Sequence, residues 1–238
     1  DGRDAGVIGT IDCRFGKTKI PSAMTTPESL DLNLNLRQMV DAGVTDCFLE
    51  VSSHALSQKR VCDMNFDVGI FTNLSRDHLD FHSNMEEYKS AKAELFRGNK
   101  VKTPILNIDD PAGKEFAAEL KGNVVSTGIK NSADYSAENI SLTAVGSRFT
   151  LKTPNGSTEI RTNLLGEHNI YNLLSASAYA LIQGMSLDMI QSTFRNIPSI
   201  PGRFESIRKG QNFSVVVDYA HTEDALSKAI TTAKAFTE

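Results

Sequence analysis

The stretch Cys47-Phe48-Leu49-Glu50-Val51-Ser52-Ser53-His54 is an apolar run that ends in an acid and two hydroxyls. This pattern predicts a buried strand followed by a polar turn. Other short apolar or β-branched runs have the same form, and longer helical patterns separate them. The predicted strands are residues 7–11, 46–51, 68–72, 104–108 and 124–126. Strands that alternate with helices predict an α/β fold, with a mostly parallel central sheet flanked by helices.

Helical patterns and one antiparallel region complete the predicted fold. The predicted helices are residues 27–42, 85–96, 110–120, 169–182 and 187–194. Between residues 134 and 165 apolar and polar residues alternate, and Asn155-Gly156 is a hairpin turn signal. We therefore expect a small antiparallel hairpin region beside the parallel strands.

A Pro-rich stretch, Ile197-Pro198-Ser199-Ile200-Pro201-Gly202, marks the predicted domain boundary. Residues 1–200 are expected to form one domain, and residues 201–238 the start of a second. Only two short strands and one helix are predicted after the boundary. Because these cannot enclose a core of their own, the second domain is expected to be truncated.

Composition excludes several classes of partner. The 238 residues carry a net charge of -4 and no basic stripe, so nucleic acid is not an expected partner. No apolar run approaches the roughly 20 residues of a membrane span, and the polar opening is unlike a signal peptide. A cytoplasmic protein is therefore expected. Cys13, Cys47 and Cys62 form no C-x-x-C pair, which argues against a disulfide framework or a thiolate zinc site.

Glu50 is the first candidate for chemistry, because it ends a predicted strand. Ligands of open α/β sheets bind beyond the carboxyl ends of the strands. An acid at that position is well placed to hold Mg²⁺ directly or through water. The alternative is structural: a paired glutamate followed by a serine that caps a helix.

A loop of residues 72–82 follows the next strand and contains Asp77, His78, Asp80 and His82. These side chains are suitable for a zinc or hydrolase site. They are equally suitable for satisfying the backbone of a turn, so the spacing leaves both readings open.

Lys92 is the third candidate. Tyr88, Lys92 and Phe96 are spaced by four residues and so share one helix face. Desolvation between aromatic rings favours the neutral amine, which can react with CO₂ to give a carbamate. The alternative is a lysine whose stem covers apolar surface while its ammonium reaches water.

A fourth cluster follows the predicted boundary and includes Arg203, Asp218, Tyr219 and His221. Asp218 ends another apolar run, where it could accept a hydrogen bond from a ribose hydroxyl. His221 or Tyr219 could border a base. A helix capped by Thr222 is the plain alternative.

In this order, the four clusters resemble the Mur ligase family. Thr25-Thr26-Pro27, together with residues 50–56, resembles its MurE branch. The resemblance extends from Thr25 to Leu226. It implies a central ATPase-like domain of an ATP-dependent amide ligase of peptidoglycan precursor synthesis. The implied substrates are ATP, UDP-N-acetylmuramoyl-L-alanyl-D-glutamate and a diamino acid, either meso-diaminopimelate or lysine, and the implied state is a monomer.

The resemblance also implies roles for individual residues. Mg²⁺ would be held by Glu50, His78 and a carbamate on Lys92. The residues that would bind the UDP-muramoyl dipeptide are Thr25, Thr26, Ser52, Gln58 and Arg60. The residues that would hold the adenosine of ATP are Asn169 or Asn172, Arg203, Asp218 and His221.

Two segments of the family pattern are not found in this sequence. The Gly-rich phosphate loop is one, since Gly16-Lys17-Thr18 lacks the upstream glycine and opens no predicted helix. The Asn-Pro-Arg segment that reads the amino acid is the other. We therefore expect a fragment that is inactive alone. A folylpolyglutamate synthetase-like ligase, a metal-dependent hydrolase and a non-catalytic nucleotide-binding module remain as alternatives.

Overall fold

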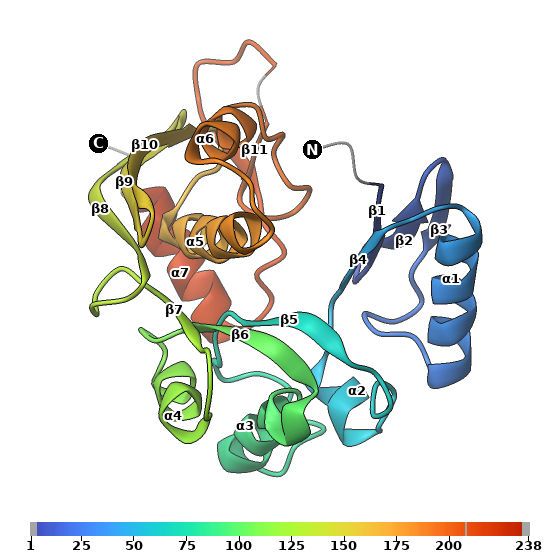
Figure 1. The fold of residues 1–238 in the computed structure, drawn as a ribbon. Helices are drawn as coiled ribbons and strands as arrows, with labels where there is room; N and C mark the ends of the chain where they lie inside the picture. Colours follow the sequence, from blue (N-terminus) through green and yellow to red (C-terminus); the bar gives the residue numbers. More distant parts are fainter. Residues whose placement is uncertain (1–3, 208, 235–238) are drawn as a thin grey trace. The chain divides into compact units, whose positions relative to one another are not determined.

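The computed structural model describes residues 4–207 and 209–234 (Figure 1). It divides into two compact units, which are described separately. The first unit comprises residues 1–66 and 78–101, and the second comprises residues 67–77 and 102–238. The predicted α/β class is confirmed, whereas the predicted domain boundary at residues 200 and 201 stays a prediction. None of the helices in the described ranges has the length and apolar character of a membrane span.

The first unit is built on a four-stranded sheet in the order β3-β2-β1-β4. Its strands are β1 (Ala5–Ile8), β2 (Asp12–Phe15), β3 (Thr18–Pro21) and β4 (Asp46–Leu49). The predicted pair, β1 and β4, is parallel, while β2 and β3 add an antiparallel hairpin that the sequence did not predict. Gly16, with a φ of 52°, makes the turn of this hairpin. Gly16-Lys17-Thr18 therefore leads into a strand and opens no helix.

Helices cover this sheet and extend the first unit. In α1 (Ser29–Asp41), Leu32 and Met39 are buried. A Cβ atom on Gly6 would lie 2.6 Å from the sulfur of Met39, so α1 packs directly on β1. The helices α2 (Ser53–Ser57) and α3 (Met85–Ala93) contact each other, and the short turn η1 (Arg97–Asn99) follows α3.

The second unit contains a six-stranded sheet in the order β10-β9-β8-β7-β6-β5. Its strands are β5 (Phe66–Phe71), β6 (Val101–Asn107), β7 (Val125–Gly128), β8 (Tyr135–Thr143), β9 (Gly146–Thr153) and β10 (Gly156–Thr162). The pairs β6–β7 and β7–β8 are parallel, and β8–β9 and β9–β10 are antiparallel. The predicted hairpin region is therefore present. The predicted strands are divided between two mixed sheets, whereas the sequence predicted a single, mostly parallel one.

Three helices pack on this sheet: α4 (Pro111–Glu119), α5 (Glu167–Ile182) and α6 (Leu187–Arg195). The main core joins α5 and α6 to the antiparallel strands. Figure 1 shows both helices beside these strands. The buried members of this core include Phe149, Leu151, Ile160, Ile170, Leu174 and Phe194. The described chain ends with the antiparallel pair β11 (Glu205–Ile207) and β12 (Val215–Val217) and with α7 (Glu223–Lys234).

Candidate functional site

Glu50 lies where the parallel strands β1 and β4 end. The backbone N–H of Glu50 donates to Ile8 O (2.9 Å), which extends the ladder by one residue. The carboxylate Oε2 accepts from the backbone N–H (3.1 Å) and the hydroxyl (2.6 Å) of Thr10. Gly9 leaves room for Oε1, because a Cβ atom there would lie 2.7 Å from it. The result is an exposed carboxylate in a fixed orientation at the carboxyl edge of the sheet, as predicted from the sequence.

Three of the predicted substrate residues surround this acid. The hydroxyl of Thr26 donates to Glu50 O (2.8 Å) and accepts from Ser52 N–H (3.0 Å). Thr25 and Thr10 share a hydrogen bond between their hydroxyls, 3.2 Å apart. Ser52 caps α2 by accepting from Ala55 N–H. The structural reading of this stretch is therefore confirmed, because Ser52 caps a helix and Glu50 is paired with Thr10. The magnesium role of Glu50 stays a prediction.

Arg60 and Gln58, the other two predicted substrate residues, lie beside Thr26. Arg60 donates to Thr26 O (2.7 Å) and Gln58 Oε1 (2.5 Å), and forms an ion pair with Glu28 (2.8 Å). Its Nε atom is buried and has no hydrogen-bond partner within the described residues. The five predicted substrate residues thus share one region of the first unit with Glu50.

His78 and Lys92 each lie against the ring of Tyr88. The Lys92 ammonium lies 5.2 Å from the ring centroid of Tyr88, in cation–π geometry. The ring of His78 stands edge-on to the same ring, with a centroid distance of 5.7 Å. The prediction that Lys92 lies against an aromatic ring is confirmed for Tyr88. His78 adopts a left-handed backbone with a φ of 54°, which is uncommon for a residue other than glycine.

Two more imidazoles lie beside His78. The ring of His54 is 4.9 Å from that of His78 and 4.0 Å from that of Phe81. Burial, together with the neighbouring His78 and His82, lowers the pKa of His54. Burial is also the main cause of the lowered pKa of His82.

The two candidate metals, Mg²⁺ and zinc, need different sets of ligands. Mg²⁺ is usually held by one or two carboxylates together with waters and substrate phosphates, and the exposed Glu50 carboxylate suits that pattern. A zinc site needs three or four protein ligands. Throughout residues 4–207 and 209–234, no group of three His, Cys, Asp or Glu side chains is placed to hold a metal ion. The zinc-hydrolase reading of residues 72–82 therefore has no support in the geometry.

The predicted adenosine residues all lie in the second unit. Asp218 accepts from the backbone N–H groups of Phe204 (2.7 Å) and Ala220 (2.8 Å). The guanidinium of Arg203 lies 5.9 Å from the ring centroid of Tyr219, and the His221 ring nitrogen Nδ1 is 2.9 Å from Tyr219 O. Arg203 thus lies beside Tyr219, in the short stretch that also carries Asp218 and His221.

Asn169 and Asn172 lie on the first turns of α5. Asn169 is 1% exposed; its side chain donates to Leu165 O (2.8 Å) and accepts from Asn172 (3.2 Å). Asn169 is therefore already committed to holding the start of the helix, and Asn172 is the freer of the two to reach a ligand.

A family model described as the Mur ligase middle domain matches residues 2–180. The chain belongs to the Mur ligase family. Among curated Mur ligases, the UDP-N-acetylmuramoyl-L-alanyl-D-glutamate--2,6-diaminopimelate ligase of Geobacillus kaustophilus is 44% identical over 240 residues, which cover 98% of this chain and 49% of that protein. The enzyme of the same name from Geobacillus thermodenitrificans is 45% identical over 242 residues, covering 99% and 50%.

Solved Mur ligase structures have the same fold. A structure titled as a UDP-N-acetylmuramoyl-L-alanyl-D-glutamate--2,6-diaminopimelate ligase superposes with a TM-score of 0.85 and 31% identity, covering 99% of this chain and 49% of the other. The MurF structure from Acinetobacter baumannii gives a TM-score of 0.69 at 23% identity, covering 85% and 45%, and supports the fold alone. The chain spans about half the length of the curated relatives it matches.

Two residues of this Mur ligase chain lie at the sites although the sequence did not single them out. Thr10 follows β1 and holds Glu50, and the rule that polar residues after strands bind ligands could have found it. The ring of His168 lies 6.0 Å from that of Phe204, and its pKa is lowered mainly by burial, against the opposing charge of Asp218. His168 directly precedes Asn169, but nothing in the spacing indicates that residue 204 folds back onto it.

Proposed function

We propose that the complete protein joins 2,6-diaminopimelate to UDP-N-acetylmuramoyl-L-alanyl-D-glutamate, using ATP, in peptidoglycan precursor synthesis in the cytoplasm. Relatives of that name are 41–45% identical over 97% or more of this chain. Their names favour diaminopimelate over lysine as the amino acid. The observation that carries the proposal is the exposed Glu50 carboxylate, oriented by Thr10 at the carboxyl ends of two parallel strands.

The chemistry proceeds in two steps. The γ-phosphoryl group of ATP passes to the free carboxylate of the D-glutamyl residue, giving an acyl phosphate and ADP. The amine of diaminopimelate then attacks the acyl carbon. Its C–N bond forms as the C–O bond to phosphate breaks, and the nitrogen loses a proton. The protein's main contribution to such transfers is placement and charge neutralisation.

Glu50, His78 and Lys92 are proposed to hold magnesium. Glu50 would supply a carboxylate oxygen. A carbamate on Lys92 would supply two more oxygens, and His78 a nitrogen, beside Tyr88. When bound, Mg²⁺ offsets the repulsion between the substrate carboxylate and the triphosphate. A carbamate on Lys92 would form from the neutral amine, which is the form that reacts with CO₂.

The UDP-muramoyl dipeptide is proposed to bind beside Glu50, at Thr25, Thr26, Ser52, Gln58 and Arg60. The unpartnered Nε of Arg60 supports this assignment, because a phosphate or carboxylate oxygen would satisfy a buried donor. Thr26 is fully buried, and its hydroxyl is already paired with backbone. Its contribution is therefore to hold the loop in place.

The adenosine of ATP is proposed to bind in the second unit. Asp218 would accept from a ribose hydroxyl, and Arg203, Asn172 and His221 would border the nucleoside. Asn169 would act by holding the first turn of α5, as its own hydrogen bonds indicate. We also propose that the protein works as a monomer.

Glu50→Gln tests this assignment. The complete protein is supplied with ATP, Mg²⁺, the UDP-muramoyl dipeptide and either diaminopimelate or lysine, and phosphate release is followed together with product mass. We expect wild-type turnover with diaminopimelate. In the variant, kcat should fall about a hundredfold or more, because the amide removes a charge at the site of phosphoryl transfer while keeping the shape.

Glu94→Gln is the matched control, since Glu94 is an exposed acid of the first unit paired with Arg97 on the surface. It should ligate normally. Near-normal turnover by Glu50→Gln would contradict the role given to Glu50. A wild-type protein that ligates neither amino acid, but is stabilised against heat by a folate, would point to the folylpolyglutamate-type alternative.

A further inference from the structure

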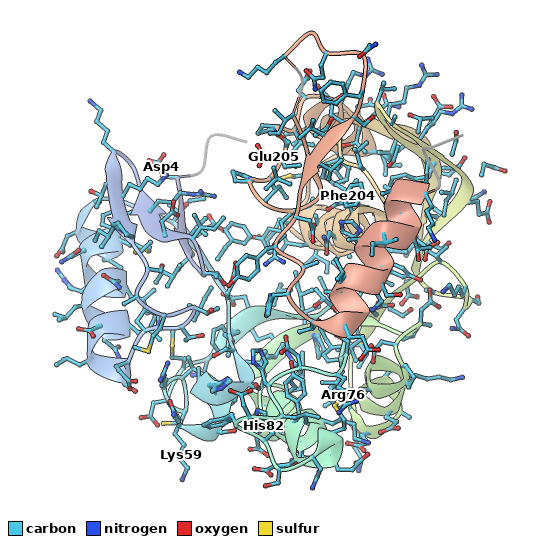
Figure 2. All side chains as sticks on the ribbon, turned by 180° about the vertical axis from the view of Figure 1, so that it is seen from behind. Asp4, Lys59, Arg76, His82, Phe204 and Glu205 are labelled. Atoms are coloured by element: carbon cyan, nitrogen blue, oxygen red, sulfur yellow. The ribbon has the colours of Figure 1, made fainter. Side chains whose placement is uncertain are left out.

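His82 is a buried imidazole for which the proposed reaction has no use. Its side chain is 1% exposed and stacks on the ring of Tyr88, with centroids 5.0 Å apart and planes 16° from parallel. Its Nε2 atom lies 2.9 Å from the hydroxyl oxygen of Ser53, which is itself 2% exposed. Its backbone N–H donates to His78 O (2.9 Å). His82, labelled in Figure 2, therefore contacts three segments of the first unit.

These contacts connect the two halves of the proposed magnesium site. Ser53 is the first residue of α2 and follows Glu50 by three positions, so fixing Ser53 fixes the end of β4. Tyr88 lies one helical turn before Lys92, whose ammonium lies against the Tyr88 ring, and the ring of His78 stands edge-on to it. One imidazole thus joins the segment that carries Glu50 to the segments that carry Lys92 and His78.

Burying the imidazole of His82 costs free energy, because one of its two ring nitrogens has no partner in the described part of the chain. Its Nδ1 atom is buried and has no hydrogen-bond partner within the described ranges. An unsatisfied buried polar atom costs about 1–3 kcal/mol. A phenylalanine would stack on Tyr88 and fill the same space without that cost. What phenylalanine cannot supply is the hydrogen bond to Ser53.

We propose that His82 is a positioning residue that sets the separation between Glu50 and the pair formed by His78 and Lys92. It does so by holding Ser53 with its ring nitrogen and Tyr88 with its ring face. Its effect on catalysis rests on the proposed function, whereas the mechanical connection between α2 and α3 does not.

A double-mutant cycle in the complete protein tests the connection. His82→Phe keeps the ring and removes the bond, and Ser53→Ala removes the same bond from the other side. We expect each variant to lower kcat about tenfold or more, because a misplacement of about 1 Å at a reacting group can cost up to about a hundredfold. KM for ATP and for the nucleotide-sugar should change less than about twofold. The double variant should be no slower than the slower single variant, because both remove one interaction.

A second measurement does not depend on turnover. His82→Ala also removes the ring beneath Tyr88, so Tyr88 should lose its fixed position. The rate at which an amine-reactive acetylating reagent modifies Lys92, followed by mass spectrometry, should then rise several-fold. Ser57→Ala, an exposed serine on the same helix as Ser53, is the matched control and should leave both kcat and the acetylation rate unchanged.

Two results would overturn the proposal: wild-type kcat in His82→Phe, or independent, multiplying losses in the double variant. Should His82→Phe fail to fold, Ser53→Ala alone decides the matter, since it must reproduce the fall in kcat at constant KM. A wild-type protein that does not ligate would refute the proposed function. In that case, unchanged acetylation of Lys92 in His82→Ala would separately refute the connection.

Discussion

At the scale of single residues, Asp109 of the second unit is held by several hydrogen bonds. Its Oδ2 atom accepts from the N–H groups of Ile129 (2.5 Å) and Lys130 (2.8 Å) and from the hydroxyl of Tyr171 (2.8 Å). Its Oδ1 atom accepts from the backbone N–H and the side chain of Asn131. Burial alone would raise the pKa of Asp109, but these donors outweigh it and lower the pKa to about 2.

Asp109→Asn should destabilise the protein and weaken the dependence of its free energy of unfolding on pH. Because the folded pKa lies below the ordinary value of 3.8, the ionised carboxylate stabilises the fold above that value, and this stabilisation is lost as the pH falls toward 2. An asparagine leaves some of the donors unpaired, at a cost of about 1–3 kcal/mol. The free energy of unfolding, measured in urea, should differ from that of wild type by a large amount at about pH 7 and by a smaller amount near pH 3. An equal difference at both pH values would contradict the role given to the charge.

The sequence predicted the positions of Glu50 and Lys92 because each depends on local chain. Glu50 needs only a strand that ends in an acid, and Lys92 only a helix with Tyr88 one turn earlier. Asp109 and His82 depend on which distant segments fold together. The partners of their side-chain hydrogen bonds are about 20 or more residues away, and no spacing rule reaches that far.

At the scale of the element, Gly113 decides how closely α4 approaches β6. A Cβ atom at this position would lie 2.0 Å from Asn107 O and 3.1 Å from the ring of Phe71. Phe71 in turn packs edge-on against Phe116 of the same helix, with centroids 5.0 Å apart. The missing side chain therefore allows the start of α4 to lie against the end of β6.

Gly113→Ala should destabilise the protein although alanine favours helices. Alanine gains about 1 kcal/mol of helix propensity over glycine, whereas overpacking against rigid backbone costs typically about 1–3 kcal/mol. The cost of the clash should exceed the gain in helix propensity, because the added Cβ would meet the backbone carbonyl of Asn107, which cannot rotate away. The free energy of unfolding, measured in urea, should fall relative to Lys114→Ala, an exposed neighbour expected to stay within about 0.5 kcal/mol of wild type. A more stable Gly113→Ala would show that α4 can shift without cost.

Long, periodic elements were predicted to within a few residues, and short ones were missed. The helix predicted at residues 169–182 is α5, and the alternating pattern of residues 148–161 gives the β9–β10 hairpin. The β2–β3 hairpin escaped prediction because each of its strands is only four residues long, which is too short to give a clear alternation. The five-residue helix α2 is too short to show a period, and tertiary contacts at Ser52 and Ser53 define it.

At the scale of the whole molecule, the two proposed binding regions belong to different compact units. The nucleotide-sugar residues and the magnesium residues lie in the first unit, and the adenosine residues lie in the second. Each ligand should therefore leave a separate signature in the protein. The fold class was predictable from the sequence, whereas the roles of both groups of residues stay predictions. Their division between two units was not predictable, because the first unit is assembled from two stretches of chain.

Hydrogen exchange of the complete protein should resolve these signatures. The UDP-muramoyl dipeptide should slow exchange in peptides spanning residues 22–28 and 50–60. Adenosine alone should slow exchange in residues 165–172 and 201–221 and leave the first set unchanged. Protection of residues 50–60 by adenosine alone would contradict the assignment of the two ligands to different units.

The interrupted first unit has a consequence for how the chain matures on the ribosome. The unit needs residues 78–101, which emerge only after residues 67–77 of the other unit. Until then Ser53 has no imidazole to bind, and the helix that carries Lys92 does not exist. A nascent chain stalled before α3 can form the β1–β4 pair and present Glu50, but it cannot assemble the rest of the proposed magnesium site.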